Sequence, residues 1–315
     1  MKAVVVTGYG PPENFTVGDV PVPHPGPGQL LVRIAAASIN PGDVRLPSGD
    51  YRDAFPLDFP HVPGNDFAGT VAEVGPGVTA YRPGDEIFGQ AVPRALKALV
   101  GPTRPSLSTG SLAEYAVFEA DTPLLTHRPP QLSTEDAAAL ATTGLTARAL
   151  LAEARIRPGD TVLVVGATGG VGTAVVPLFA HAGAKVVATA TAADADLLRD
   201  LGAHRTVAYG EYPDVDLALN LVLPGDDLDG LARAVRPGGR LLTITPDPRP
   251  TVDVDVRFVL DLDGRTGGMA GVVDSVRAGA LKATIGRRYS LDQAPQACVD
   301  FVRRHTTGKL VVAVR

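Results

Sequence analysis

The sequence predicts an α/β protein that combines a β-rich domain with a doubly wound parallel sheet. The first third of the chain holds short apolar segments divided by glycine and proline, which is typical of a β-rich domain. From about residue 133, apolar segments alternate with helical patterns, and one of them leads into a glycine-rich turn. A chain of 315 residues with 45% hydrophobic positions is long enough for two ordinary cores and too short for three.

The β-rich part is expected to hold short strands separated by turns. The strands are expected at 2–7, 29–37, 68–74, 86–88 and 113–118. Between two of them, the segment 91–109 carries three prolines and the basic residues Arg94, Lys97 and Arg104. We expect this segment to be a surface excursion, either a lid or a plain loop.

The alternating part is expected to begin with a helix at 133–151, because the Ser133 hydroxyl can cap the first turn and Asp136 stands three positions later. Further strands are expected at 161–165, 185–189, 216–221 and 240–245, and then helices at 268–278 and 292–304 and a strand at 309–314. The final segments are expected to return to the first domain. The predicted domains are therefore 1–121 with 259–315, and 122–258.

Composition excludes several classes of protein. Lys and Arg number 29 against 34 Asp and Glu, and this net charge of -5 argues against a nucleic-acid partner. The single cysteine, Cys298, excludes intramolecular disulfides and four-thiolate zinc sites, which favours the cytoplasm. Residues 161–184 lack charged side chains, but their glycines and Pro177 indicate a strand, a turn and a buried helix. No membrane span and no export signal are predicted.

The glycine-rich turn follows the apolar strand 161–165 and precedes an apolar helix that reaches about residue 182. It consists of Gly166, Ala167, Thr168, Gly169, Gly170, Val171 and Gly172. This order of strand, turn and helix is typical of a dinucleotide site, where the backbone approaches a pyrophosphate and a helix N-terminus offers N–H groups. The glycine spacing departs from G-x-G-x-x-G, so a tight packing turn is the alternative.

The end of the next strand bears on which cofactor is bound. No acidic residue follows 185–189 before Asp194, whereas an NAD site normally has a carboxylate there for the ribose 2′-hydroxyl. This favours NADPH over NADH. No Lys or Arg lies in the turn, so the hydroxyls of Thr189 and Thr191 are the best local donors to a 2′-phosphate. Alternatively, both are ordinary threonines at a strand end.

Several stretches, taken together and in order, resemble zinc-free members of the medium-chain dehydrogenase/reductase superfamily, close to the quinone oxidoreductases and zeta-crystallin. The matching stretches are 25–33, 38–43, 63–71, 137–151, 166–172, 236–240 and 305–312. The resemblance implies a GroES-like catalytic domain interrupted by a Rossmann domain. It places Asn40, Asn65 and Thr142 where zinc-dependent relatives hold a catalytic metal, and none of these is a good zinc ligand. We therefore expect no metal, and we assign Thr142 to the cofactor site.

The resemblance also implies candidate catalytic residues, in the pattern N-x-x-D-x-x-x-R-x-G-x-Y. Asn40, Asp43 and Tyr51 match it, while Pro47 stands where the pattern has arginine. Asn40 is expected beside the nicotinamide as a hydrogen-bond donor to the substrate oxygen, and Tyr51 as a proton donor. The alternatives are that Asn40 pins the turn before Pro41 and that Tyr51 is an exposed loop residue.

The expected function is NADPH-dependent hydride transfer to the activated C=C of a small quinone or α,β-unsaturated carbonyl, by a homodimer. Without a Lewis acid, an enolate is easier to stabilise than the alkoxide formed by reducing an isolated carbonyl. The first alternative is an enoyl-thioester reductase, in which Arg94, Lys97 and Arg104 serve a phosphopantetheine. The second is a non-catalytic NADPH-binding protein. A hydrolase is not expected, because no G-x-S-x-G occurs.

Overall fold

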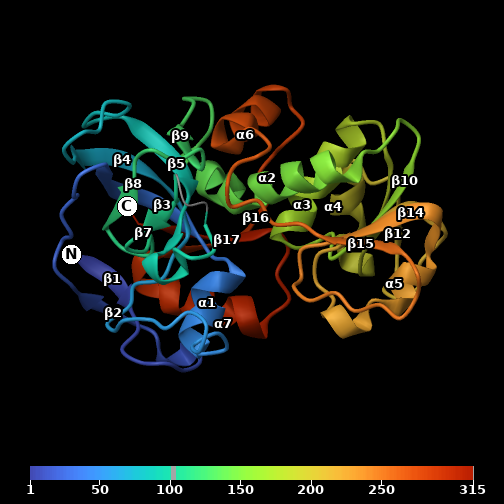
Figure 1. Cartoon of the computed structure of the whole chain (residues 1–315), viewed down its shortest axis with the longest axis horizontal. Coiled ribbons are helices and arrows are strands. Elements are labelled where there is room, and N and C mark those ends of the chain that lie inside the picture. Colours follow the sequence, from blue (N-terminus) through green and yellow to red (C-terminus); the bar gives the residue numbers. More distant parts are fainter. Residues whose placement is uncertain (101–103, 315) are drawn as a thin grey trace. The chain divides into compact units, whose positions relative to one another are not determined.

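The computed structural model describes residues 1–100 and 104–314, and it divides into two compact units (Figure 1). Unit 1 comprises Met1–Thr142, Leu262–Val273 and Ile285–Arg315, and unit 2 comprises Thr143–Asp261 and Asp274–Thr284. Unit 1 is built on a mainly antiparallel sheet and unit 2 on a parallel sheet, so the predicted combination of a β-rich domain with a doubly wound parallel sheet is confirmed.

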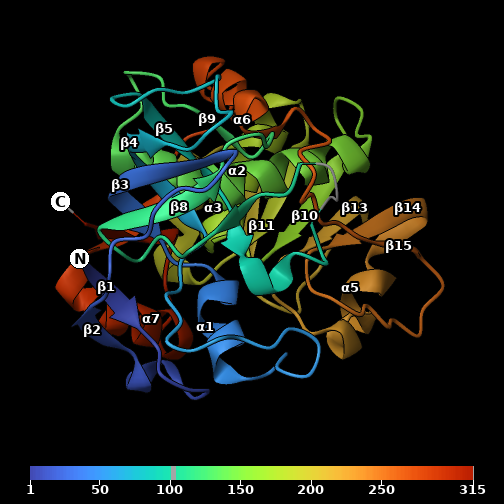
Figure 2. The same cartoon turned by 60° about the vertical axis from the view of Figure 1, so that its left-hand side comes forward.

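Unit 1 is organised around one large sheet. Its strands within the described chain are β3 (Gln29–Ser38), β4 (Asp66–Val74), β5 (Glu86–Gln90), β6 (Val92–Pro93), β7 (Leu107–Ser108), β8 (Tyr115–Glu119), β9 (Leu125–His127), β16 (Ile285–Ser290) and β17 (Lys309–Ala313). The long strand β3 pairs antiparallel with β4 and β8 (Figure 2), and it also pairs antiparallel with β17. Strand β17 also pairs with β16, so the C-terminal segment completes the sheet of the first domain, as predicted.

Apolar side chains from both ends of the chain form the core of unit 1. Phe67 of β4 stacks on Phe118 of β8 with ring centroids 3.8 Å apart, and both rings are fully buried. The hairpin of β1 (Lys2–Val5) and β2 (Thr16–Asp19) adds Val4, and the helix α7 (Ala294–Arg303) adds Cys298 to the same core. The cysteine therefore packs as a small apolar residue.

Unit 2 contains a six-stranded parallel sheet within the part of the chain that the structure describes. Its strands, in spatial order, are β12 (Arg205–Val207), β11 (Lys185–Thr189), β10 (Thr161–Val165), β13 (Val215–Asn220), β14 (Val235–Thr243) and β15 (Asp255–Phe258). The chain order reverses beside β10, because β11 lies on one side of it and β13 on the other. Such a reversal marks the place where open α/β sheets bind their ligands.

Most of the helices lie where the sequence predicts them, but the helix at 41–48 lies in the part expected to be β-rich and is not among the predicted helices. The helices are α1 (Pro41–Ser48), α2 (Thr134–Ala154), α3 (Gly170–His181), α4 (Ala195–Asp200), α5 (Asp229–Arg233), α6 (Gly268–Arg277) and α7. The Ser133 hydroxyl accepts the Asp136 N–H at 3.1 Å, as the cap of α2 requires. The division between the units falls inside α2, later than the change of pattern in the sequence indicates. None of the helices in the described ranges has the length and apolar character needed to cross a membrane.

The predicted excursion at 91–109 is only partly described, because residues 101–103 lie outside the described residues. What is described includes β6, β7 and the 3₁₀ helix η2 (Arg94–Leu96). Two of its basic residues are paired with carboxylates: Arg94 lies 3.3 Å from Glu119, and Arg104 lies 2.7 Å from Asp121. These two charges are therefore partly neutralised within unit 1.

Candidate functional site

The turn between β3 and α1 holds two of the predicted catalytic residues. Asn40 is the N-cap of α1, and Pro41 occupies the first helical position, where its missing N–H costs nothing. The carboxylate of Asp43 accepts the backbone N–H of Asn40 at 2.7 Å, which completes a capping box. Gly49, with φ of 92°, ends the helix. Local sequence signals therefore fix Asn40 and Asp43 next to each other, and both are buried.

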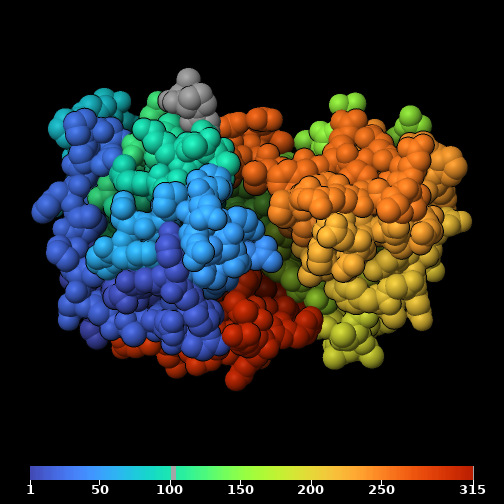
Figure 3. Space-filling model, turned by 60° about the horizontal axis from the view of Figure 1, so that its bottom comes forward, coloured from blue at the N-terminus to red at the C-terminus, as the bar shows by residue number. Residues whose placement is uncertain are grey.

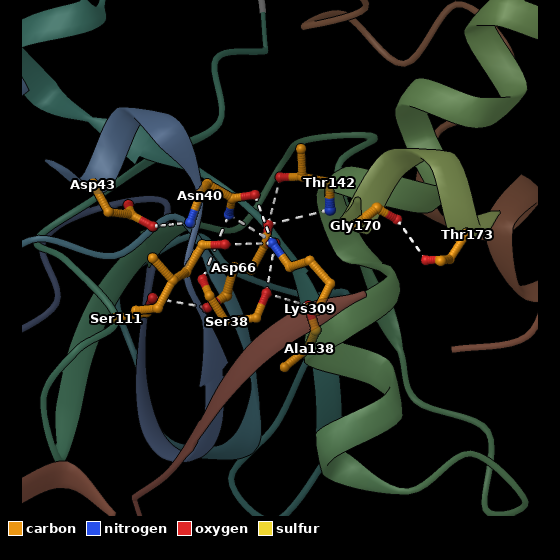
Figure 4. Close-up of polar contacts among 11 residues, drawn as sticks. Ser38, Asn40, Asp43, Asp66, Ser111, Ala138, Thr142, Gly170, Thr173 and Lys309 are labelled. Atoms are coloured by element: carbon orange, nitrogen blue, oxygen red, sulfur yellow. Dashed lines mark hydrogen bonds and ion pairs between the residues drawn. The ribbon is translucent and has the colours of Figure 1, made fainter. Parts of the chain in front are cut away.

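Asp66, the first residue of β4, is the centre of a buried polar cluster (Figure 4). Its Oδ2 accepts the hydroxyl of Ser38 at 2.8 Å and the side-chain amide of Asn40 at 2.8 Å. Its Oδ1 accepts the backbone N–H of Thr142 at 3.1 Å and the Thr142 hydroxyl at 2.5 Å. Ser38 and Asp66 face each other in the antiparallel register of β3 and β4, which brings the two side chains together.

Lys309, the first residue of β17, supplies the positive charge of this cluster. Its ammonium donates to the carbonyl oxygen of Ile39 at 2.7 Å and to Oδ1 of Asn40 at 2.7 Å, and it lies 3.4 Å from Oδ2 of Asp66. Only 6% of the residue is exposed. We call Ser38, Asn40, Asp66, Thr142 and Lys309 the Asp66 network. All five residues belong to unit 1.

Burial and neighbouring charge shift the titration of two groups at this site. Burial raises the pKa of Asp43 to about 7, and the charge of Asp66 adds to the effect, while the N–H of Asn40 and the charge of Lys309 oppose it. Oδ1 of Asp43 is buried and has no hydrogen-bond partner among the described residues. Burial lowers the pKa of Lys309, against the opposing pull of Asp66 and Asp43. The site therefore holds charges that solvent screens little.

The carboxamide of Asn40 is held in one orientation by its two charged neighbours. An ammonium can only donate and a carboxylate can only accept, so Oδ1 must face Lys309 and Nδ2 must face Asp66. The second N–H of Nδ2 has a much weaker partner, the carbonyl oxygen of Ser38 at 3.5 Å. Asn40 thus has one N–H that is firmly bound and one that is loosely bound.

Tyr51, the predicted proton donor, lies outside the Asp66 network. It follows the end of α1, in a segment that reaches the molecular surface (Figure 3), and 38% of the residue is exposed. Its hydroxyl makes no hydrogen bond within the described residues, so the phenol is free to bind a ligand. Pro47 occupies a buried position inside α1, and its carbonyl oxygen accepts the N–H of Gly10 at 2.9 Å.

The three positions expected to correspond to metal ligands do not form a metal-binding set. Asn40 and Thr142 are both committed to Asp66, and Asn65 is directed toward Gly42, where an added Cβ would lie 3.3 Å from its Nδ2. In residues 1–100 and 104–314, no group of three or more His, Cys, Asp or Glu side chains is arranged to hold a metal ion.

The glycine-rich turn of unit 2 has the geometry of a close backbone approach. Gly166 has φ of 89°, and Gly169 caps α3. A Cβ on Gly172 would lie 2.3 Å from the carbonyl oxygen of Gly166 and 2.5 Å from Ala167, so only glycine fits there. Within the turn, Gly166, Ala167 and Thr168 are buried, whereas Gly169, Gly170 and Val171 are partly exposed. The backbone at the start of α3 is therefore accessible, as a dinucleotide site requires.

The two threonines expected near a 2′-phosphate occupy different environments. The Thr189 hydroxyl is fully buried, accepts the N–H of Gly166 at 3.1 Å and donates to the carbonyl oxygen of Val164 at 3.3 Å. The hydroxyl therefore supports the turn from within the domain, and its expected contact with a 2′-phosphate stays a prediction. Thr191 is exposed, but its hydroxyl donates to the carboxylate of Asp194 at 2.7 Å.

The sequence did not single out Asp66 or Lys309, although they carry the charge of the network. Their partnership spans 243 positions, and no local pattern reports so distant a pair. One signal was available: Lys309 opens the apolar strand segment Lys309–Ala313, where a buried lysine needs a partner. Asp66 likewise opens a strand whose first four residues are buried.

Comparison with known proteins agrees with this architecture. Residues 26–129 match the model of the alcohol dehydrogenase GroES-like domain, and residues 182–312 match that of zinc-binding dehydrogenases. The chain is 30% identical to quinone-oxidoreductase QR1 of Triphysaria versicolor, over 99% of this chain and 98% of that protein. It is 32% identical to a 2-methylene-furan-3-one reductase of Solanum lycopersicum, over 99% of this chain and 79% of that protein.

A solved structure of a mycobacterial protein complexed with NADPH also superposes on the chain. The TM-score is 0.83 at 28% identity, and the match covers 99% of each chain. Since a relative at 30% identity spans nearly its whole length and both of its domains match, the chain belongs to the medium-chain dehydrogenase/reductase superfamily, as a relative of the quinone oxidoreductases.

Proposed function

We propose that this protein is an NADPH-dependent reductase that transfers hydride to the activated C=C of a quinone or α,β-unsaturated carbonyl, without a metal. The observation that carries the proposal is the Asp66 network. In it, Lys309 donates to the side-chain oxygen of Asn40, and the side-chain amide of Asn40 donates to Asp66, so neither oxygen is left open for a metal ion. Similarity to a quinone oxidoreductase and to a furanone reductase supports the substrate class.

Zinc does not fit the residues present. A catalytic zinc site needs three ligands of the Cys, His or carboxylate type. Oδ1 of Asn40 already accepts a hydrogen bond from the ammonium of Lys309 at 2.7 Å. The Thr142 hydroxyl already donates to the carboxylate of Asp66 at 2.5 Å. Placing a dication there would bring it next to the ammonium. The proposed reaction therefore has no step that uses a metal.

The residues present do fit a dinucleotide. Gly172 has no room for a Cβ, and the partly exposed backbone of Gly169 and Gly170 begins a helix of 12 residues. We assign the pyrophosphate to the turn formed by residues 166–172, where the N–H groups and the helix dipole favour an anion. Bound NADPH would supply the hydride from its nicotinamide ring. The absence of an acid between Thr189 and Asp194 supports NADPH, whereas the position of Asp194 beside Thr191 opposes it.

The chain supplies two groups for the substrate oxygen and the proton. In conjugate reduction the negative charge moves to the carbonyl oxygen as an enolate, which needs hydrogen-bond donors. The loosely bound N–H of Asn40, 3.5 Å from its protein acceptor, is available to donate to this oxygen. The free phenol of Tyr51 is available to return a proton to the product. Asp43 contributes by holding the N–H of Asn40 and thereby the start of α1.

The test is NADPH consumption measured against panels of quinones, enones and enoyl thioesters, before and after treatment with a chelator. Activity with quinones or enones that survives chelation is expected. Product from a deuterium-labelled cofactor should carry the label on the β-carbon, whereas a labelled carbinol carbon would show carbonyl reduction instead. Exclusive use of thioesters would favour the enoyl-thioester reductase, and NADPH binding without any turnover would favour a non-catalytic protein.

Tyr51→Phe tests the proton donor within the same assay. Turnover should fall by about tenfold or more, with the affinity for NADPH unchanged. Tyr209→Phe is the matched control, because Tyr209 is also an exposed tyrosine, with 49% exposure.

Two further proposals are a homodimer in solution, tested by light scattering, and residence in the cytoplasm, tested by fractionation of the source cells.

A further inference from the structure

We propose that Lys309 is a positioning residue that fixes the orientation of the Asn40 carboxamide and keeps one of its N–H groups available to the substrate oxygen. The expected effect of Lys309 on catalysis rests on the proposed function, whereas its effect on the orientation of the Asn40 carboxamide does not. Lys309 reaches the site from the far end of the chain, 269 positions from Asn40.

The geometry makes Lys309 a three-point anchor. An ammonium has three N–H bonds, and three acceptors surround this one: the carbonyl oxygen of Ile39 at 2.7 Å, Oδ1 of Asn40 at 2.7 Å and Oδ2 of Asp66 at 3.4 Å. Asn40 and Ile39 are consecutive, so the lysine binds the backbone and the side chain of the same turn. Strand β17, which carries the lysine, is itself paired with β3.

The alternative orientation of the carboxamide is disfavoured at both ends. Rotating the Asn40 amide by half a turn would place Nδ2 against the ammonium of Lys309, donor against donor. The same rotation would place Oδ1 against the carboxylate of Asp66, acceptor against acceptor. Two contacts of 2.7 and 2.8 Å would both become repulsive. Without the ammonium, only the contact with Asp66 would discriminate between the two orientations.

Lys309 also balances the charge beneath the site. Asp66 is fully buried, and an enolate oxygen that approached Asn40 would meet the field of this carboxylate. The ammonium, 3.4 Å from Asp66, offsets that field, and its hydrogen bond to Oδ1 polarises the Asn40 amide so that its N–H groups become stronger donors. The orientation and the donor strength of Asn40 therefore both depend on Lys309.

The structural part can be tested by NMR without any substrate. The chain has four asparagines, so selective ¹⁵N-asparagine labelling gives four side-chain amide pairs, assigned by single substitutions of Asn14, Asn40, Asn65 and Asn220. The Asn40 protons should exchange slowly with solvent in the wild type and at least about tenfold faster in Lys309→Met. Asn220, whose amide is held by Leu223, Thr243 and Thr245 in unit 2, is the internal control and should not change.

The catalytic part is tested by asking whether Lys309 acts through Asn40. Lys309→Met should lower kcat by about tenfold or more and leave the dissociation constant of NADPH within about twofold. Adding Lys309→Met to Asn40→Ala should cost little further, because the group that Lys309 positions is already gone. Lys185→Met is the matched control, since Lys185 also opens a strand but is exposed.

Two outcomes would overturn the inference: unchanged exchange of the Asn40 amide in Lys309→Met, or losses of kcat that are fully additive with Asn40→Ala. If Lys309→Met does not fold, the charge-balanced pair Lys309→Met with Asp66→Asn replaces it, with the same expected change in the Asn40 amide. If the wild type reduces no substrate, the proposed function fails, while the NMR experiment still decides the role of Lys309.

Discussion

The ammonium of Lys309 lies 2.7 Å from the side-chain oxygen of Asn40, although 269 positions of sequence separate the two residues. The contact exists because β17 pairs with β3 in a register that sets Val311 opposite Ser38, beside the turn that carries Asn40. Lys309 also forms a buried ion pair with Asp66, in which 6% of the lysine side chain and 0% of the aspartate side chain are exposed. The turn after β3 and the first residues of β4 and β17 therefore determine the electrostatics of the site together.

Asp66→Asn is expected to destabilise the protein strongly. Removing one partner of a buried ion pair leaves the other charge without compensation, which typically costs about 3–5 kcal/mol. The ammonium of Lys309 would be that charge. Equilibrium unfolding in urea measures the effect, and adding Lys309→Met should recover part of the loss, because the double variant buries no charge of this pair.

The control for this comparison is an exposed ion pair. Asp274 lies 3.8 Å from Arg277 on the surface of α6, with 75% of its side chain exposed. Asp274→Asn should change the free energy of unfolding by less than about 1 kcal/mol. A loss in Asp66→Asn no larger than this would show that the Asp66 network contributes little to stability.

Asp43→Asn is expected to change how stability depends on pH. Asp43 has a pKa near 7 in the folded protein and an ordinary value of 3.8 when exposed, so the folded state binds its proton more tightly. The stabilisation that protonated Asp43 provides is therefore present at low pH and lost as pH rises through about 7. Between about pH 5 and about pH 8, ionisation of Asp43 should lower the free energy of unfolding by about 2–3 kcal/mol.

Unfolding experiments across this pH range check the prediction. The Asp43→Asn variant should lose less stability than the wild type as pH rises, since the introduced carboxamide cannot ionise, while its carbonyl oxygen still accepts the N–H of Asn40. Identical pH profiles for the two proteins would contradict a raised pKa at Asp43. Asp53→Asn, a change at an exposed carboxylate in the segment after α1, should leave the profile of the wild type unaltered.

The fold was largely predictable because the relevant signals are local. Prolines, glycines and apolar segments mark the strand 161–165 and the helix after it, and the structure places β10 and α3 there. Asn40 and Asp43 could be found as a capping pair within four residues. Lys309 and Asp66 could not, since strand register decides their contact. The support that Thr189 gives to the turn could not be predicted either, because only the structure shows that its hydroxyl accepts the N–H of Gly166.

Gly172→Ala is expected to abolish the binding of NADPH while leaving most of unit 2 folded. The added Cβ would lie 2.3 Å from the carbonyl oxygen of Gly166, which is far inside van der Waals contact, so the turn must shift. A shifted turn withdraws the N–H groups that the pyrophosphate needs. Titration of NADPH followed by its fluorescence should show a dissociation constant raised at least about a hundredfold.

Gly230→Ala is the matched control for this substitution. Gly230 lies in α5, and a Cβ added there would meet nothing within 4 Å. Alanine at such a helical position should stabilise the protein slightly, by up to about 1 kcal/mol, with NADPH binding unchanged. Wild-type affinity in Gly172→Ala would show that the glycine-rich turn is a packing feature and not the cofactor site.

Asp194→Asn is expected to shift the cofactor preference toward NADPH. The carboxylate of Asp194 accepts the Thr191 hydroxyl at 2.7 Å, at the end of the second strand where the ribose of a dinucleotide would lie. A negative charge there repels a 2′-phosphate and suits a 2′-hydroxyl, so its removal should tighten NADPH binding several-fold and leave NADH binding equal or weaker. Calorimetric titration of both cofactors at low salt measures the two affinities, and the gain for NADPH should shrink at high salt. Asp196→Asn, two positions later in α4 and paired with Arg199, is the control and should change neither affinity. If Asp194→Asn weakens NADPH instead, the carboxylate holds Thr191 in place for the phosphate, and the repulsion argument is wrong.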